Sequence, residues 1–417
     1  MFRKLLTFDQ AQKTIRRQFE PKPLGAEEIP LLESHNRVLA EDAKSVMDVP
    51  PFDRSTVDGY AVKARDTFGG EENRPRSLKV CGAISIGEPP KTTVGGSEAV
   101  EIVTGAPMPR GADAVVMVEH IQRQGEKVLV FDAVTPDENV MNAGADIKKG
   151  ETVLKTGHLL GSREIGVLAA LGTTKIKVYL VPRVAVLSTG PEVTEPGKKL
   201  SPGKIYDINA YSLSAGVLES GGRPIYLGVF SDDLYELQKA VRNALAKADM
   251  VVTSGGVSVG PKDVMPKVLS SFGEPGIVVC GVAMKPGKPT TVASIEQKPV
   301  FALPGHPTSA LLAFHLFVRP IIKLMAGRGI EESLEVKAFA GMRMFPAKGR
   351  RTFVMVKFER DKSNRLVAQP LPTGASGAIM TLAKADGFVE IAEDVQFVDA
   401  DEEVVAHVFR VCDKGWF

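Results

Sequence analysis

Hydrophobic residues between positions 183 and 327 follow two patterns that alternate along the chain. Short apolar runs rich in branched residues are separated by longer segments in which apolar residues recur every three or four positions. The runs are VAVLSTG, PIYLGVF, DMVVTSGG and PVFALPG, and the longer segments include NAYSLSAGVLES and LYELQKAVRNALAKA. This alternation predicts a doubly wound, mostly parallel sheet with right-handed crossovers. Ligands bind such sheets outside the carboxyl ends of the strands.

The remainder of the chain shows other patterns. Residues 7–19 place apolar side chains on one helical face, with Thr7 and Gln10 spaced as a capping box. Residues 47–146 consist of short apolar runs broken by Gly, Pro and Asp, which predicts an all-β module. A further helix is predicted at SREIGVLAALG, and the residues beyond 327 have the pattern of a second small β module.

Composition narrows the class of protein. A chain of 417 residues is too long for one core, so several domains are expected. Its 52 Lys and Arg against 50 Asp and Glu do not indicate a nucleic-acid or membrane-surface protein. Cys81, Cys280 and Cys412 have no disulfide or zinc-site spacing, which favours a reducing compartment. No signal peptide or spanning segment is evident, and we expect a cytoplasmic protein.

The predicted strand ends carry polar loops, namely STGPE, SDD, TSGGVSVGPKD and LPGHPTS. In the third loop, Gly255 and Gly256 lack the Cβ atoms that would oppose positive φ and close approach of a ligand. Their backbone N–H groups are therefore candidate donors to an anion. By itself, the same pattern is explained equally well by a tight turn between a strand and a helix.

Five residues with carboxylate side chains lie in or beside these loops. They would repel one another unless protons or a divalent cation offset their charge, which favours a Mg²⁺ site. Each one alone also fits a structural role, with Asp232 or Asp233 as a helix cap and Asp207 as a turn residue. The five are Glu192, Asp207, Asp232, Asp233 and Asp263.

Other polar groups have two interpretations each. Lys285 and Lys288 flank Pro286 and Gly287, so a stiff loop presents two ammonium groups that could hold an oxyanion or could simply be solvated. His306 lies in a rigid turn as either a ligand or a structural residue. In the β module, Asp58 and Thr104 each precede a glycine and fit either turns or ligand contacts.

Together these segments closely resemble the molybdopterin molybdenumtransferase family, called MoeA in bacteria and represented in animals by the E domain of gephyrin. The resemblance covers nearly the whole chain. Its motifs, in order, are PPFDRSTVDGYAV, TGAPMPRGADAVVMVE, NVMNAGADIKKG, STGPE, GKIYDINAYSL, TSGGVSVGPKD, MKPGKPT, LPGHPTSA and GASGAIMTLAKADGFVEI.

The resemblance implies a fold of four domains per subunit in a homodimer. Residues 1–46 and 147–178 would form a discontinuous domain I, and residues 47–146 a β insertion as domain II. Residues 179–328 would form an α/β domain III like that of the molybdopterin adenylyltransferase MogA, and residues 329–417 a C-terminal β barrel as domain IV.

The resemblance also implies an activity, which is insertion of molybdate into adenylylated molybdopterin with release of AMP and a requirement for Mg²⁺. By motif matching, catalytic roles fall to Asp263, Glu192, Asp58 and Asp146, with Glu192 and Asp263 as metal ligands. Substrate contacts fall to Thr104, Ser254, Gly255, Gly256, Ser258, Lys285, Lys288, Pro304, Pro307, Asp232 and Ser376. The family cleft forms between subunits, so the insertion of one chain would complete the α/β site of the other. A MogA-type adenylyltransferase and apo-molybdoenzymes are further candidate partners.

The chain departs from the family pattern in three places. His306 replaces a common Asn, Pro191 a common Asp, and Met141 and Asn142 occupy a segment that usually contains an Arg. The absence of this Arg removes one expected anion contact. Tungstate stays an alternative to molybdate as the substrate. Two other functions are weighed, an adenylyltransferase and a scaffold on the same fold. The full-length match argues against the first, and the lack of a long linker and second enzymatic domain argues against the second.

Overall fold

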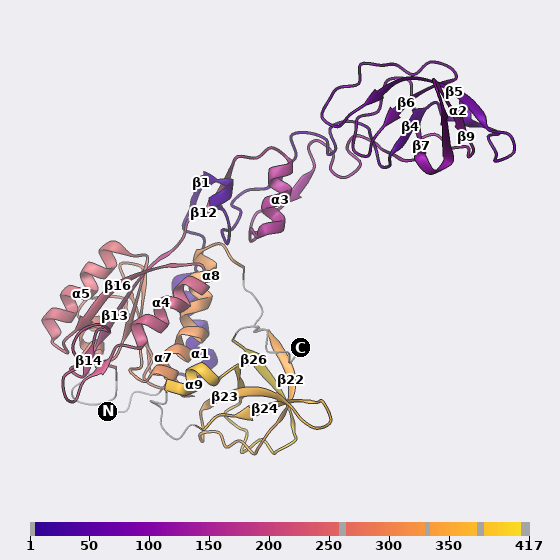
Figure 1. Ribbon diagram of the computed structural model, residues 1–417. Coiled ribbons are helices and arrows are strands. Elements are labelled where there is room, and N and C mark those ends of the chain that lie inside the picture. Colours follow the sequence, from indigo (N-terminus) through magenta and orange to yellow (C-terminus); the bar gives the residue numbers. More distant parts are fainter. Residues whose placement is uncertain (1–4, 258–263, 330–333, 373–378, 410–417) are drawn as a thin grey trace. The chain divides into compact units, whose positions relative to one another are not determined.

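The structure is a computed structural model that describes residues 5–257, 264–329, 334–372 and 379–409 (Figure 1). The chain forms two compact units. Unit 1 contains Met1–Glu28, Asn36–Ala40 and Lys177–Phe417, and unit 2 contains Ile29–His35 and Glu41–Ile176. The chain passes between the units four times, after Glu28, His35, Ala40 and Ile176. The first and last passages lie within β1 (Ala26–Pro30) and β12 (Lys175–Tyr179).

Unit 1 contains the predicted doubly wound sheet, with strand order β16-β13-β17-β21-β20-β18. The first four strands are parallel and are those that the apolar runs predict, so this prediction is confirmed. The last two strands, which are paired antiparallel, extend the sheet beyond them. In sheet order the bounds are Arg223–Phe230, Arg183–Thr189, Met250–Ser254, Lys298–Leu303, Thr291–Ile295 and Gly276–Cys280.

Helices cover both faces of this sheet (Figure 1). Successive residues of β13 point to opposite faces: Val186 packs with the helices α4, α7, α8 and α1, whereas Leu187 packs with α5 and α6. Burial on both faces is why these strands appear as continuous apolar runs in the sequence. The helices are α1 (Phe8–Phe19), α4 (Asn209–Glu219), α5 (Leu234–Lys247), α6 (Met265–Ser270), α7 (Pro307–Ala313), η3 (Phe314–Val318) and α8 (Arg319–Met325).

The segments α7, η3 and α8 form one helical stretch, Pro307–Met325, with a π-helical turn in the middle. This stretch of 19 residues is the one helix in the described part of the chain that is long and apolar enough to cross a membrane. Its apolar window is 61% buried inside the protein, as in a core helix.

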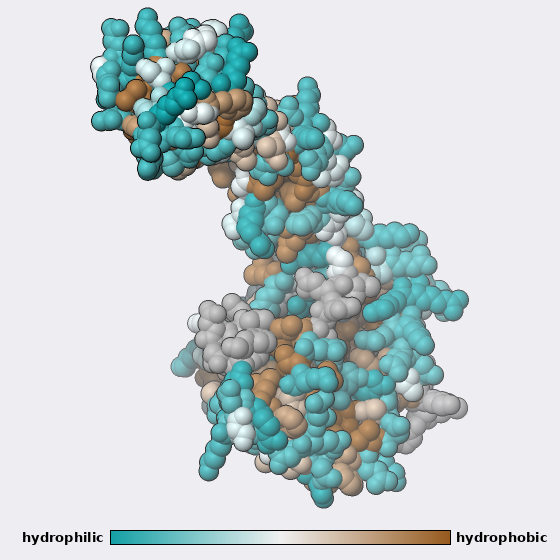
Figure 2. Space-filling view, turned by 90° about the vertical axis from the view of Figure 1, so that its right-hand side faces the viewer, coloured by the Kyte–Doolittle hydropathy of each residue, from teal (hydrophilic) through white to brown (hydrophobic). Residues whose placement is uncertain are grey.

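Figure 2 shows a mostly hydrophilic face with groups of apolar side chains between the polar ones.

His315 in this stretch gives the protein an acid-sensitive contact. Its ring meets Phe388 and Phe409 edge-on, with centroids 5.8 and 5.2 Å away. The pKa of His315 is lowered from 6.5 to about 3. Burial is the largest cause, and the charges of Arg319, Lys323 and His407 lower the pKa further. The unfolded chain therefore binds the proton more readily, and stability is lost as the pH falls from about 6.5 towards 3.

We expect the free energy of unfolding to fall by about 3 kcal/mol between pH 7 and pH 4 because of this group. Urea unfolding followed by circular dichroism at several pH values measures the loss. His315→Gln should lose clearly less stability over the same range, whereas substitution of the exposed His35 should leave the wild-type dependence intact. Equal slopes for wild type and His315→Gln would contradict the assignment.

The C-terminal part of unit 1 is a closed five-stranded barrel, as predicted. Its strands pair in the order β23-β24-β22-β26-β25, and β25 pairs again with β23. The short strand β19 (Met284–Lys285) adds to β23 outside the ring. The barrel strands are β22 (Glu335–Ala340), β23 (Arg351–Arg360), β24 (Leu366–Pro370), β25 (Gly387–Ile391) and β26 (Glu403–Val408), and α9 (Ile379–Lys384) precedes β25.

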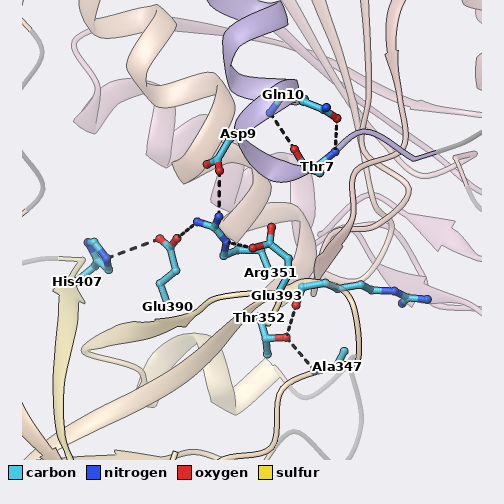
Figure 3. A network of polar contacts seen from close by, with 10 residues as sticks. Thr7, Asp9, Gln10, Ala347, Arg351, Thr352, Glu390, Glu393 and His407 are labelled. Atoms are coloured by element: carbon cyan, nitrogen blue, oxygen red, sulfur yellow. Dashed lines mark hydrogen bonds and ion pairs between the residues drawn. The ribbon is translucent and has the colours of Figure 1, made fainter. Parts of the chain in front are cut away.

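Helix α1 packs within unit 1. The predicted capping box is present, because Gln10 N donates to Thr7 Oγ1 over 3.2 Å and Thr7 N donates to Gln10 Oε1 over 3.0 Å. Arg351 at the start of β23 connects α1 to the barrel (Figure 3). Its guanidinium donates to Asp9 over 3.1 Å and also binds Glu390 and Glu393.

Unit 2 holds the predicted β module as a six-stranded sheet with the order β7-β4-β6-β5-β9-β8. In sheet order the bounds are Ala114–Met117, Gly59–Val62, Glu98–Ile102, Arg76–Ile84, Lys127–Val130 and Ile121–Gln124. The helix predicted after residue 161 is present as α3 (Ser162–Ala170). Smaller elements of unit 2 are η1 (Leu31–Glu33), β2 (Ala43–Lys44), β3 (Arg54–Ser55), α2 (Ala64–Thr67), η2 (Val118–His120), β10 (Val140–Met141) and β11 (Thr152–Leu154). The exact boundaries of the four domains stay a prediction.

Candidate functional site

The four polar loops leave the sheet of unit 1 at one edge. Parallel pairing aligns the strand ends, since Ser188 lies opposite Ser254 and Ser254 opposite Leu303. Strand β18 runs in the same direction as β21, because both are antiparallel to β20. The loop that carries Lys285 and Lys288 follows β18 and therefore also starts from this edge. This is the edge at which doubly wound sheets bind ligands.

Asn209 at the start of α4 joins two of these loops. Its Nδ2 donates to Ser254 Oγ and to the Gly305 carbonyl, each over 2.7 Å. Ser254 Oγ in turn donates to the Pro304 carbonyl over 3.1 Å. The side-chain oxygen Oδ1 of Asn209 is buried and has no partner among the described residues. Asn209 was missed as a site residue, although GKIYDINAYSL marks the start of its helix.

We expect Asn209→Ala to lower the free energy of unfolding by about 2–3 kcal/mol, because one buried and one partly buried short hydrogen bond are lost. Chemical denaturation of the whole protein measures this change. Asn243→Ala provides the matched control, since Asn243 is an exposed residue in α5. A similar loss in both variants would show that Asn209 does not hold the loops together.

The glycine turn after β17 comes very close to the end of β13. Gly255 has φ +100°, and a Cβ atom there would lie 2.0 Å from the carbonyl oxygen of Thr189. Gly256 has φ +64°, and its Cβ atom would lie 3.2 Å from Thr189 Cγ2 and 3.8 Å from Asp232 Oδ1. Thr189 Oγ1 donates a hydrogen bond to Asp232 Oδ1. The structure thus brings Asp232 beside the glycine turn, together with Thr189, which the sequence had not singled out.

Glu192 follows β13 and is exposed. Its carboxylate lies against the backbone of Gly190, where an added Cβ atom would be 2.9 Å from Oε2. The Glu192 carbonyl accepts from Ile205 N over 2.8 Å, between the short strands β14 (Val193–Thr194) and β15 (Ile205–Tyr206). These contacts fix the backbone of Glu192 and leave its carboxylate accessible to solvent.

Two of the five carboxylates have structural roles. Asp233 is the N-cap of α5 and accepts from Glu236 N over 2.9 Å. Asp207 is buried and accepts from Ser188 Oγ over 2.9 Å and from Ala210 N over 3.0 Å, at the start of α4. Of the two candidate caps of α5, Asp233 is therefore the one that caps the helix, and the structural interpretation of Asp207 is confirmed.

The predicted metal site is described only in part. Asp263, Ser258 and Ser376 lie outside the described residues. Within the described ranges, no group of three or more His, Cys, Asp and Glu side chains could hold a metal ion. Mg²⁺ commonly takes only one or two protein carboxylates, with waters and phosphate oxygens completing its shell. The accessible oxygens of Glu192 fit that donor chemistry, and the Mg²⁺ site stays a prediction.

The two lysines are available for an anion. Lys285 is exposed and Lys288 half-buried, and neither ammonium group has a partner among the residues that the structure describes. Their loop is held by the Gly287 carbonyl, which accepts from Thr290 N over 3.0 Å and from Thr290 Oγ1 over 2.7 Å. His306 is the N-cap of α7 but makes no capping bond with its side chain, and Pro307 begins that helix.

Three predicted site residues lie in unit 2. Asp58 Oδ1 accepts from Thr104 N over 2.7 Å and from Thr104 Oγ1 over 2.9 Å. These hydrogen bonds lower the pKa of Asp58, and the bond from the Thr104 backbone has the larger effect. Asp146 is exposed in the same unit. Met141, in the segment that departs from the family pattern, lies 3.2 Å from the guanidinium of Arg54 through its sulfur atom.

Comparisons with known proteins cover most of the chain. Residues 6–172 match the family model described as the MoeA N-terminal region (domain I and II). Residues 185–324 match the model described as a probable molybdopterin binding domain, and residues 337–409 match the MoeA C-terminal region (domain IV).

Relatives and solved structures match over nearly the full length. The molybdopterin molybdenumtransferase of Haemophilus influenzae is 34% identical over 97% of this chain and 99% of that protein. The enzyme of the same name from Bacillus subtilis is 34% identical over 87% of this chain and 84% of its own. The crystal structure of a molybdopterin biosynthesis MoeA protein from Pyrococcus horikoshii is 41% identical and covers 98% of this chain and 100% of its own, with a TM-score of 0.87.

Proposed function

The chain belongs to the MoeA family of molybdopterin molybdenumtransferases, and on that premise we propose that it inserts molybdate into adenylylated molybdopterin and releases AMP in the cytoplasm. The observation that carries the proposal is the full-length similarity to enzymes of that name, together with polar loops that leave one edge of the sheet. A MogA-like adenylyltransferase, the runner-up function, would not need the β module and barrel that this chain shares with its relatives.

The chemistry requires that an oxyanion and a phosphate be held close together. Molybdate is a dianion, and Lys285 and Lys288 offer two ammonium groups without competing partners among the described residues. In the glycine turn, the Gly255 N–H already donates to the Leu303 carbonyl over 3.2 Å, so the backbone donor that the turn would offer to a substrate phosphate is the Gly256 N–H. Preorganised cations and backbone donors of this kind stabilise charge that develops in the transition state. Replacement of oxo ligands of molybdate by the pterin sulfurs then requires that the two substrates are aligned. It requires no covalent enzyme intermediate.

The carboxylates complete the proposed site. Glu192 and Asp263 would hold Mg²⁺, which when bound supplies positive charge for the phosphate of the substrate. Asp232 is oriented by Thr189 and lies beside the glycine turn, where it can orient a proton or a hydroxyl group of the substrate. In unit 2, Thr104 holds Asp58 in its ionised form, so Asp58 can act as a hydrogen-bond acceptor.

The first test uses purified protein with adenylylated molybdopterin, Mg²⁺ and molybdate. We expect AMP release that depends on molybdate and yields active cofactor, and we expect no release from Asp263→Asn. AMP release without molybdate, or consumption of ATP, would support the adenylyltransferase instead. Parallel assays with tungstate test the choice of oxyanion.

We also propose that the enzyme is a homodimer in which Asp58 of one chain completes the site that contains Lys285 of the other. Two inactive variants, Asp58→Asn and Lys285→Gln, are unfolded together and refolded as a mixture. A site shared between chains restores one active site in each mixed dimer, which gives about a quarter of the wild-type activity after random pairing. A site within one chain restores none.

A further inference from the structure

Arg54 in unit 2 has a guanidinium group without an ion-pair partner among the residues that the structure describes. It lies on the short strand β3, which pairs antiparallel with β10, and its partner across the two strands is Met141. Directly opposed side chains in such a pair lie close together. Accordingly, Arg54 Nη2 lies 3.2 Å from Met141 Sδ.

This contact uses little of the hydrogen-bonding capacity of Arg54. A guanidinium group presents five N–H donors in a planar fork, whereas a thioether sulfur is only a weak acceptor. The side chain of Arg54 is half-buried, so water reaches only part of it. Forks of this kind match the oxygens of a phosphate group in pairs. The free donors of Arg54 therefore suit a phosphate group.

Arg54 also lies beside predicted site residues of unit 2. The next residue, Ser55, donates its N–H to the Ala106 carbonyl over 3.0 Å. Two residues before Ala106, Thr104 donates to Asp58 with both its backbone N–H and its hydroxyl group. Arg54 and Asp58 therefore belong to one hydrogen-bonded pair of segments.

Three carboxylates lie in the same segments, and none of them forms an ion pair with Arg54. Asp58 accepts the two hydrogen bonds described above, and Asp53 Oδ1 accepts from Ala143 N over 2.7 Å. Asp146 is exposed. These carboxylates would repel the phosphate of a substrate unless a cationic donor lay beside them, and Arg54 provides such a donor.

We propose that Arg54 binds a phosphate group of adenylylated molybdopterin and supplies the guanidinium contact that Met141 cannot make. The choice of ligand rests on the proposed function. The register of β3 and β10 makes the exchange possible, because opposed residues have Cβ atoms only about 5 Å apart. Molybdate is assigned to Lys285 and Lys288, so the loss of Arg54 should affect only one of the two substrates.

The test is titration calorimetry of the whole protein with adenylylated molybdopterin in the absence of molybdate. We expect Arg54→Gln to weaken binding about tenfold, because hydrogen bonds between charged groups are lost. Adding Met141→Arg to this variant should restore most of the affinity, since it returns a guanidinium to the opposed position. Arg65→Gln is the matched control and should bind like the wild type, because Arg65 is an exposed residue of α2 in the same unit.

Kinetics identify the anion that Arg54 holds. Arg54→Gln should raise the KM for adenylylated molybdopterin about tenfold and leave the KM for molybdate unchanged. The proposal is overturned by a rise in the KM for molybdate alone, by equal binding of Arg54→Gln and wild type, by a loss that Met141→Arg does not restore, or by no saturable binding to the wild type. A wild type that binds adenylylated molybdopterin but releases no AMP contradicts the proposed function, and the binding result for Arg54 still holds. Circular dichroism verifies that the variants fold.

Discussion

Gly255→Ala is expected to lower the free energy of unfolding by about 3 kcal/mol or more and to abolish AMP release. The added methyl group would lie 2.0 Å from the carbonyl oxygen of Thr189, and φ at this position is +100°. Relief of the clash would move the end of β17 away from β13. Because Thr189 also holds Asp232, the same movement would disturb the candidate site. Urea unfolding and the AMP assay measure the two effects.

A matched control separates steric clash from backbone strain. Gly197 also has positive φ, +89°, but an added Cβ atom there would meet no other atom within 4 Å. Gly197→Ala should therefore cost only about 1 kcal/mol, which is the strain of a left-handed alanine. Equal losses in the two variants would mean that the contact between β17 and β13 is not tight.

Lys285→Gln is expected to reduce the rate of AMP release by about 10²–10³-fold, which is typical for loss of one preorganised charge-stabilising group. The side chain is exposed and has no partner among the described residues, so the free energy of unfolding should change by less than about 0.5 kcal/mol. Steady-state assays at several molybdate concentrations measure the rate, and urea unfolding verifies the stability.

Lys239→Gln on the surface of α5 is the control for Lys285, and it should leave the rate unchanged. Lys285→Arg keeps the charge and should recover part of the activity if charge alone is needed. A decrease of less than threefold in Lys285→Gln would remove this lysine from the proposed site.

Patterns within single segments predicted the elements well. Apolar runs buried on both faces identified β13, β16, β17 and β21, and the spacing of Thr7 and Gln10 identified the capping box of α1. Strands β18 and β20 were not predicted, because short apolar runs with few flanking signals do not distinguish strand from helix. The sequence also left open whether Asp232 or Asp233 caps α5, because adjacent aspartates before a helix offer the same capping group.

Contacts between segments that are distant in the sequence could not be predicted from local patterns. Asn209 and Thr189 belong to the candidate site through hydrogen bonds that span 45 and 43 positions of the chain. No local pattern marks such pairs, since the side chains meet only after the sheet has formed.

The sequence by itself determined the types of the main elements, the closed C-terminal barrel through its family motifs, and membership in the MoeA family. Periodicity and motif order are properties of neighbouring residues, so they can be observed without coordinates. Only the tertiary structure decided which carboxylate caps α5 and which side chains hold the strand-end loops together. These outcomes depend on distances across the fold, and hydrogen bonds and desolvated charges change in energy over a few ångströms.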